Sequence, residues 1–239
     1  MFENKCDLEN VFGELAARLP LSTDGSESFT FTSESLPVPP SQIETQKLYI
    51  NKSTHTYNDS YKFDLLYFNA HKEIYRNLGL LILSAIFHPQ PPEILVKLNH
   101  SESEISNLII EYKHFDSVNP YPGYHTKPVY FEYYPALSWK HPFDKCISPR
   151  DLPCFSLSNM ECFLNSNKDW KNRDTVRIFG SDTGMVLFAE LLLNAALPQN
   201  EEDEYQLEGE GGFRGVGINS SEVTLLLPGH IFWFDEHWS

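Results

Sequence analysis

Five residues in the middle of the chain have side chains suited to acid–base or nucleophilic chemistry. Imidazole exchanges a proton near neutral pH, and a thiolate beside an imidazole is a nucleophile. The sequence has neither a Gly-x-Ser-x-Gly elbow nor a His-Glu-x-x-His pair, so we assign no catalytic residue. Packed aromatic strands with incidental histidines are the favoured interpretation, and a ligand cleft of an enzyme or small-ligand-binding protein is the alternative. The cleft residues are His125, Tyr130, Tyr133, His141 and Cys146.

Three cysteines, Cys146, Cys154 and Cys162, recur at eight-residue intervals near His141. Thiolates and imidazoles are the ligands that zinc prefers. Structural zinc sites usually place paired cysteines about two to four residues apart, and the chain has no Cys-x-x-Cys pair. We therefore expect free thiols in or near the core, with no metal and no cofactor.

A glycine-rich segment, residues 209–217, includes Arg214 and could in principle cradle a phosphate. A dinucleotide-binding loop must lead into a helix, whereas the residues that follow here have the pattern of a strand. No Walker-type Lys-Ser or Lys-Thr pair follows either. A connecting loop is therefore favoured over a phosphate site.

Acidic residues are concentrated just before this loop. The run is either a solvated loop, which is the favoured interpretation, or a patch that attracts a basic protein. Apolar residues near the C-terminus are expected to dock on the core, on a partner or on a second copy of the chain. The candidate partner-binding residues are Glu201, Glu202, Asp203, Glu204, Arg214, Trp233 and Trp238.

The charge balance restricts the partners further. The 239 residues include 33 acidic and 18 basic side chains, so the formal net charge at pH 7 is −15. Nucleic acids and anionic membranes are bound through clustered Lys and Arg, which are scattered here, so we expect neither as a partner. The first residues lack the pattern of a signal peptide, and the longest apolar run is too short to cross a bilayer. We therefore expect a cytoplasmic protein.

Hydrophobic spacing predicts the elements that must position these residues. Helices are expected at 7–19 and from 181 to before Pro198. Residues 70–87 favour a helix, with a buried strand at 80–83 as the alternative. An edge strand is expected at 29–32, and a hairpin is expected from 46–51 and 61–68. Further strands, forming a meander or mixed sheet, are expected at 94–98, 108–114 and 128–134, and three more at 174–179, 204–207 and 222–227. Residues 138–171 show no sustained periodicity and predict an irregular stretch.

Together these patterns predict an α+β fold with a mixed or mainly antiparallel sheet and two to three helices, ending in a β-α-β-β unit. Residues 1–165 form the N-terminal α+β region, and residues 170–239 form the C-terminal unit. The two regions are either separate or parts of one continuous domain.

The C-terminal unit combines strand and helix hydrophobics with a glycine before the helix and a Ser-Glu pair before the final strand. These positions are Val176–Gly180, Gly184, Phe188–Leu193, Tyr205–Glu208 and Ser221–Leu225. In this pattern the unit resembles small bacterial proteins associated with polymorphic-toxin immunity. The resemblance covers about the last 70 residues and implies a non-enzymatic protein that binds and neutralises a cognate toxin. The acidic charge would suit a basic nuclease. No binding residue is carried over, because the matching positions are those of strand and helix cores.

Overall fold

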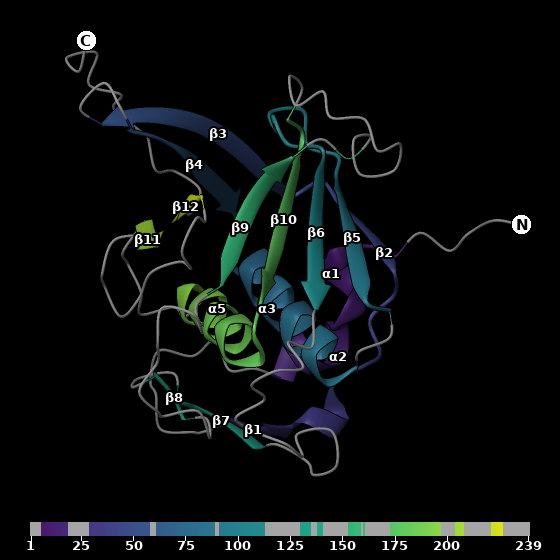
Figure 1. Ribbon diagram of the computed structural model, residues 1–239. Coiled ribbons are helices and arrows are strands. Elements are labelled where there is room, and N and C mark those ends of the chain that lie inside the picture. Colours follow the sequence, from purple (N-terminus) through teal and green to yellow (C-terminus); the bar gives the residue numbers. More distant parts are fainter. Residues whose placement is uncertain are drawn as a thin grey trace, which may run out of the picture.

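The computed structural model describes residues 6–18, 29–57, 61–88, 91–112, 130–134, 138–140, 153–158, 160, 173–196, 204–207 and 221–226. They form an α+β fold with mixed sheets, which confirms the predicted fold class (Figure 1). The helices are α1 (Leu8–Val11), α2 (Gly13–Arg18), α3 (Lys72–Phe87) and α5 (Asp182–Ala195), with a short 3-10 turn, η1 (Ser33–Ser35).

The described strands form three sheets. The five-stranded sheet has the order β2 (Gln42–Thr45), β5 (Glu93–Leu98), β6 (Asn107–Tyr112), β10 (Thr175–Gly180), β9 (Cys154–Ser158). The four-stranded sheet has the order β11 (Glu204–Leu207), β12 (Glu222–Leu226), β4 (Tyr61–Ala70), β3 (Leu48–Tyr57). The small sheet contains β1 (Phe29–Thr32), β7 (Tyr130–Tyr134) and β8 (Ser138–Lys140). The pairs β2/β5, β6/β10 and β4/β12 are parallel, and the other pairs are antiparallel.

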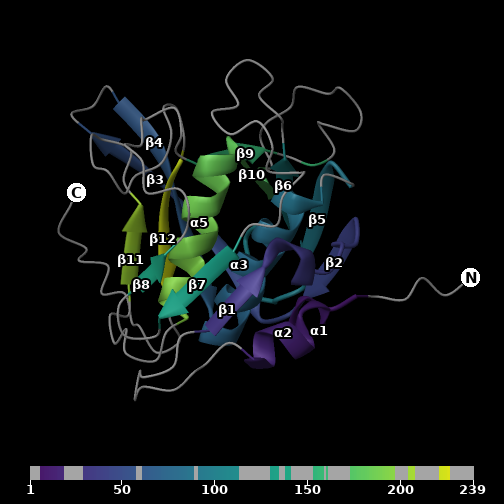
Figure 2. The ribbon, with the colours of Figure 1, turned by 90° about the horizontal axis from the view of Figure 1, so that it is seen from below.

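Helix α3 is the centre of the core. Twelve of its sixteen residues are buried, so it is enclosed on all sides instead of presenting one apolar face. Helix α5 packs against it at Gly79, where an added Cβ would lie 3.0 Å from a backbone oxygen of α5. The Ser181 hydroxyl caps α5 by accepting the Gly184 N–H at 3.2 Å. The two helices lie between the two larger sheets and the small sheet (Figures 1 and 2).

A buried tyrosine ties α3 to the four-stranded sheet. The Tyr75 hydroxyl accepts the backbone N–H of Leu226 at 3.0 Å. It also lies 2.5 Å from the carbonyl oxygen of Phe68 and 2.6 Å from that of Leu226, and can donate to either. The Tyr75 side chain is fully buried, and this burial raises the pKa of its hydroxyl. The hydroxyl therefore stays protonated and joins the ends of β4 and β12.

The two larger sheets are also joined to each other. The Ser221 N–H, just before β12, donates to the carbonyl oxygen of Phe155 in β9 at 2.9 Å. The ring of Phe155 makes edge contacts with Phe68 of β4 and with Phe188 of α5. The carbonyl oxygen of Ile50 in β3 accepts two N–H groups from the loop between β5 and β6. Strands after residue 170 thus enter both sheets beside strands that precede residue 165.

The prediction of one continuous helix at residues 7–19 is wrong. It is divided into α1 and α2 at Phe12, whose φ of −111° and ψ of 18° are not helical. Gly13 follows, and glycine weakens a helix interior because it has the most backbone freedom to lose. The predicted cap Asp7 makes no side-chain capping hydrogen bond. Its backbone instead forms a parallel bridge with Glu44 of β2.

The sheet expected from three successive strands, a meander or a mixed sheet, does not include the third of them, β7. Strands β5 and β6 are antiparallel neighbours, but the second neighbour of β6 is β10, and β7 pairs with β1 in the small sheet. The hairpin of β3 and β4 and the strands β1, β10, β11 and β12 are confirmed.

Two strands lie inside the stretch predicted to be irregular, β8 and β9. Strand β9 follows Pro153 and has too few residues to show a period. It forms a strand through its backbone pairing with β10, which its own sequence does not predict. Strand β2 was not expected either, and only four residues form it.

Candidate functional site

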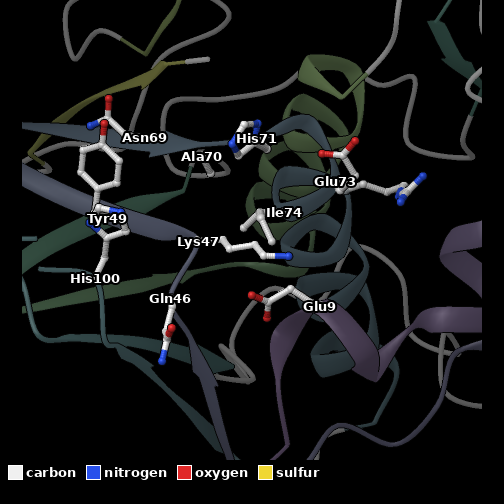
Figure 3. A pocket seen from close by; sticks show the side chains of 11 residues that line it. Glu9, Gln46, Lys47, Tyr49, Asn69, Ala70, His71, Glu73, Ile74 and His100 are labelled. Atoms are coloured by element: carbon white, nitrogen blue, oxygen red, sulfur yellow. The ribbon is translucent and has the colours of Figure 1, made fainter. Parts of the chain in front are cut away.

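A groove opens where the N-terminus of α3 meets the adjoining ends of β3 and β4. Its volume is about 580 Å³, which is within the range of small-molecule sites. Most of the lining side chains are polar, and they include both acidic and basic groups. They come from α1, β3, β4, α3 and the segments beside β2 and β5 (Figure 3). The lining residues are Glu9, Gln46, Lys47, Tyr49, Asn69, Ala70, His71, Glu73, Ile74, Arg76 and His100.

One wall of the groove is a stacked pair of rings. The centroids of Tyr49 and His100 lie 4.5 Å apart, with an angle of 22° between the ring planes. The Nδ1 atom of His100 accepts the backbone N–H of Glu102 at 3.2 Å, so the neutral imidazole carries its proton on Nε2. Burial, and then the charge of Glu102, raise the pKa of Tyr49. This wall therefore presents protonated donors held in a fixed orientation.

Lys47 extends across the groove toward α3 (Figure 3). Its backbone N–H donates to the Thr45 hydroxyl at 3.1 Å, which fixes the short turn between β2 and β3. The Lys47 side chain is exposed, and no ion pair joins it to any residue that the structure describes. Its ammonium group is thus available to a ligand.

The N-terminus of α3 forms the opposite side of the groove. His71 is the N-cap residue and makes no side-chain capping hydrogen bond. The Glu73 N–H lies in the first turn, where no preceding helical carbonyl exists to accept it. The helix macrodipole adds partial positive charge at this end.

Glu9 lies at the base of the groove. One of its carboxylate oxygens accepts the Thr45 hydroxyl at 3.2 Å. The other, Oε2, is buried and has no hydrogen-bond partner among the described residues. Because the first oxygen is engaged and the second is covered, this carboxylate holds the site together more than it faces the opening.

A second cluster of charges spans the five-stranded sheet. Arg177 of β10 donates to Glu93 of β5 at 3.0 Å and to Glu111 of β6. The Glu111 side chain is 7% exposed, against 51% for Glu93. Burial alone would lower the pKa of Arg177, but the hydrogen bonds to both carboxylates outweigh it and raise the pKa. This arrangement neutralises the charge of Arg177 and joins β10 to β5 and β6.

The exposed charges that the structure describes are strongly biased. Seven carboxylates are exposed, whereas Lys47 is the one exposed cation among the described side chains. The exposed carboxylates are Asp7, Glu14, Glu34, Glu73, Glu93, Glu102 and Glu104.

Most residues of the two sites expected from the sequence fall outside the described residues. This holds for His125, His141 and Cys146 of the cleft, and for Glu201, Glu202, Asp203, Arg214, Trp233 and Trp238 of the partner surface. Tyr130 and Tyr133 lie in β7 and Glu204 begins β11, with only their backbones described. Both predicted sites therefore remain predictions.

The expected thiols and metal ligands are described only in part. Cys154 is half-buried in β9, and Cys146 and Cys162 lie outside the described residues. Among the described residues, no group of three His, Cys, Asp or Glu side chains is arranged to hold a metal ion. No helix in the described part of the chain is both long and apolar enough to span a bilayer.

No family model, no curated protein and no solved structure matches this chain.

Sequence reasoning missed the groove entirely. Its polar lining comes from segments as far apart as residues 9 and 100, and each segment contributes one to four lining residues without a motif. The sequence shows one usable signal, the His71 that ends a strand pattern and begins a helix pattern. That signal is common at helix starts and does not point to a site.

Proposed function

We propose that this chain is a non-catalytic bacterial protein that binds a basic protein partner. By the resemblance of its C-terminal unit, it would be of the immunity type and would neutralise a cognate toxin in the cytoplasm. The observation that carries the proposal is the excess of exposed carboxylates, seven against one exposed cation among the described side chains. The same excess argues against nucleic acid or an anionic membrane as the partner.

The physical consequence of this charge is a field that extends beyond contact distance. At physiological salt the field decays over about 8 Å, so it orients a basic partner before contact. Such steering raises the association rate more than it raises the affinity.

The experiment is capture of partners from a lysate of the source organism on the tagged chain, at 50 and 300 mM salt, with identification by mass spectrometry. The proposal expects one stoichiometric basic protein, retained less well at the higher salt. A lysate that repeatedly yields nothing, or a partner that is acidic and insensitive to salt, would refute it. Light scattering on the purified chain separates this outcome from simple self-association.

A second candidate function is small-ligand binding, and the groove favours it. The sequence predicted a cleft lined by His and Tyr, and this groove has those residue types at different positions, Tyr49, His71 and His100. None of its lining side chains is a serine, threonine or cysteine, so binding is a better supported activity than acyl transfer.

A further inference from the structure

We propose that the groove at the N-terminus of α3 binds a small ligand through an anionic group, a carboxylate or a phosphate. This inference rests on the small-ligand function proposed above and gives the chemical class of its ligand.

The first support is the distribution of positive charge. The described surface is acidic, yet its one exposed cation, Lys47, lies in this groove. Arg76, His71 and His100 also line it. In the lining, the positive groups of Lys47 and Arg76 equal the carboxylates of Glu9 and Glu73 in number, so the groove lacks the excess of carboxylates seen on the described surface. An anionic group can pair with the Lys47 ammonium, because no described carboxylate already forms an ion pair with it.

The second support is that donors of different kinds line the same groove. The Lys47 ammonium extends toward the first turn of α3 (Figure 3). That turn offers the Glu73 N–H and the positive end of the helix dipole. The imidazole of His100 carries its proton on Nε2, because its Nδ1 is occupied by the Glu102 N–H. Carboxylate and phosphate oxygens accept from all three kinds of donor.

Two carboxylates also line the groove and have to be accounted for. One oxygen of Glu9 is engaged by the Thr45 hydroxyl, and the other, Oε2, is buried, so little of this carboxylate is accessible to a ligand. The Glu73 side chain is exposed and would repel an anion, even though its backbone N–H would attract one. Removing the Glu73 charge should therefore strengthen anion binding, whereas removing the Lys47 charge should weaken it.

The experiment is titration of the full chain followed by 1H–15N NMR at constant ionic strength. Pyrophosphate tests the phosphate arm, citrate tests the carboxylate arm, and cadaverine serves as a cationic probe. The anion inference expects saturable shifts of the Glu73 amide and of the His100 ring with at least one anion. Lys47→Ala should weaken that binding by about tenfold. Glu73→Gln should strengthen it by about two- to threefold.

The matched control is Lys97→Ala, because Lys97 carries the same charge on β5 and does not line the groove. This control should change the anion affinity by less than about twofold. Equal losses for Lys47→Ala and Lys97→Ala would refute the inference, since they would mean that only net charge matters. Saturable binding of cadaverine, strengthened by Lys47→Ala, would refute the anionic class while leaving small-ligand binding in place. Absence of saturable shifts with all three probes would refute both.

Discussion

The hydroxyl of Tyr75 makes the most localised contribution to stability that the structure describes, so Tyr75→Phe is the sharpest perturbation. The substitution removes one oxygen and keeps the ring that fills the core. It deprives the Leu226 N–H of its acceptor at 3.0 Å, and it deprives one carbonyl, of Phe68 or of Leu226, of its donor. All of this occurs around a fully buried side chain.

The expected cost follows from leaving these groups unpaired. A buried donor or acceptor without a partner costs about 1 to 3 kcal/mol, and the hydroxyl hydrogen serves only one carbonyl at a time. We therefore expect Tyr75→Phe to lower the free energy of unfolding by about 2 to 4 kcal/mol. The matched control is Tyr49→Phe, whose hydroxyl forms no hydrogen bond with a described residue and which should change stability by about 0.5 kcal/mol or less.

The assay is urea denaturation of both variants, with hydrogen exchange at the Leu226 amide. Exchange at that amide should accelerate in Tyr75→Phe and stay unchanged in Tyr49→Phe. Equal stability losses in the two variants would refute the role assigned to the Tyr75 hydroxyl.

The pH dependence supplies an independent check. Burial raises the pKa of Tyr75 in the folded chain, whereas an unfolded tyrosine ionises near pH 10. Above about pH 10 the folded state holds the proton that the unfolded state has lost, so stability falls by about 1.4 kcal/mol per pH unit. Phenylalanine has no proton to lose, so the advantage of the natural chain over Tyr75→Phe should shrink between pH 10 and 11. A constant difference across this range would contradict the predicted ionisation.

Two further substitutions test the packing and the charge cluster. Gly79→Ala should lower the free energy of unfolding by about 1 to 3 kcal/mol, because the added Cβ would lie 3.0 Å from a backbone oxygen of α5. This close contact should outweigh the better helix propensity of alanine. Gly13→Ala is the control, because an added Cβ there has nothing within 4 Å, and it should leave the stability unchanged or raise it. Equal shifts of the thermal unfolding midpoint for the two variants would argue against the close contact between α3 and α5. Arg177→Met should lower the free energy of unfolding by about 3 to 5 kcal/mol at pH 7, because it removes the guanidinium from the buried Glu111 carboxylate. Glu93→Ala should lower it by less than about 1 kcal/mol, because Glu93 is exposed. Urea unfolding measures both losses of stability, and equal losses for Arg177→Met and Glu93→Ala would count against this assignment.

Local patterns predicted the parts of the fold that local energetics decide. The helical spacing of α3, the Ser181 cap of α5 and the hairpin of β3 and β4 are each visible in a short window of sequence. Such windows predicted the element type correctly even where their bounds moved by a few residues.

Short windows of sequence could not predict which distant strands pair with each other. Strand β6 lies between β5 and β10, although β10 begins more than sixty residues later. The tie from Tyr75 to Leu226 joins residues 151 positions apart. Pairings of this kind depend on which apolar faces the whole chain can bury together, and a single sequence carries no local mark of them.

The groove illustrates the same limit for function. Lys47, Tyr49, His71 and His100 are ordinary residues at the ends of ordinary elements, and only the fold places them around one space. The histidines that the sequence did single out, His125 and His141, attracted attention because aromatic residues surround them along the chain.

The central claim is that acidic charge directs this chain to a basic protein. The most direct measurement is the association rate constant with the captured partner for the double reversal of Glu201 and Glu202 to lysine. The control is the same reversal at Glu14 and Glu34, which are exposed and change the net charge equally. We predict that both variants associate more slowly than the natural chain at 50 mM salt, that the Glu201 and Glu202 reversal is at least tenfold slower than the control, and that these differences shrink at 300 mM. Association rates that match the natural chain in both variants at both salt concentrations would contradict it.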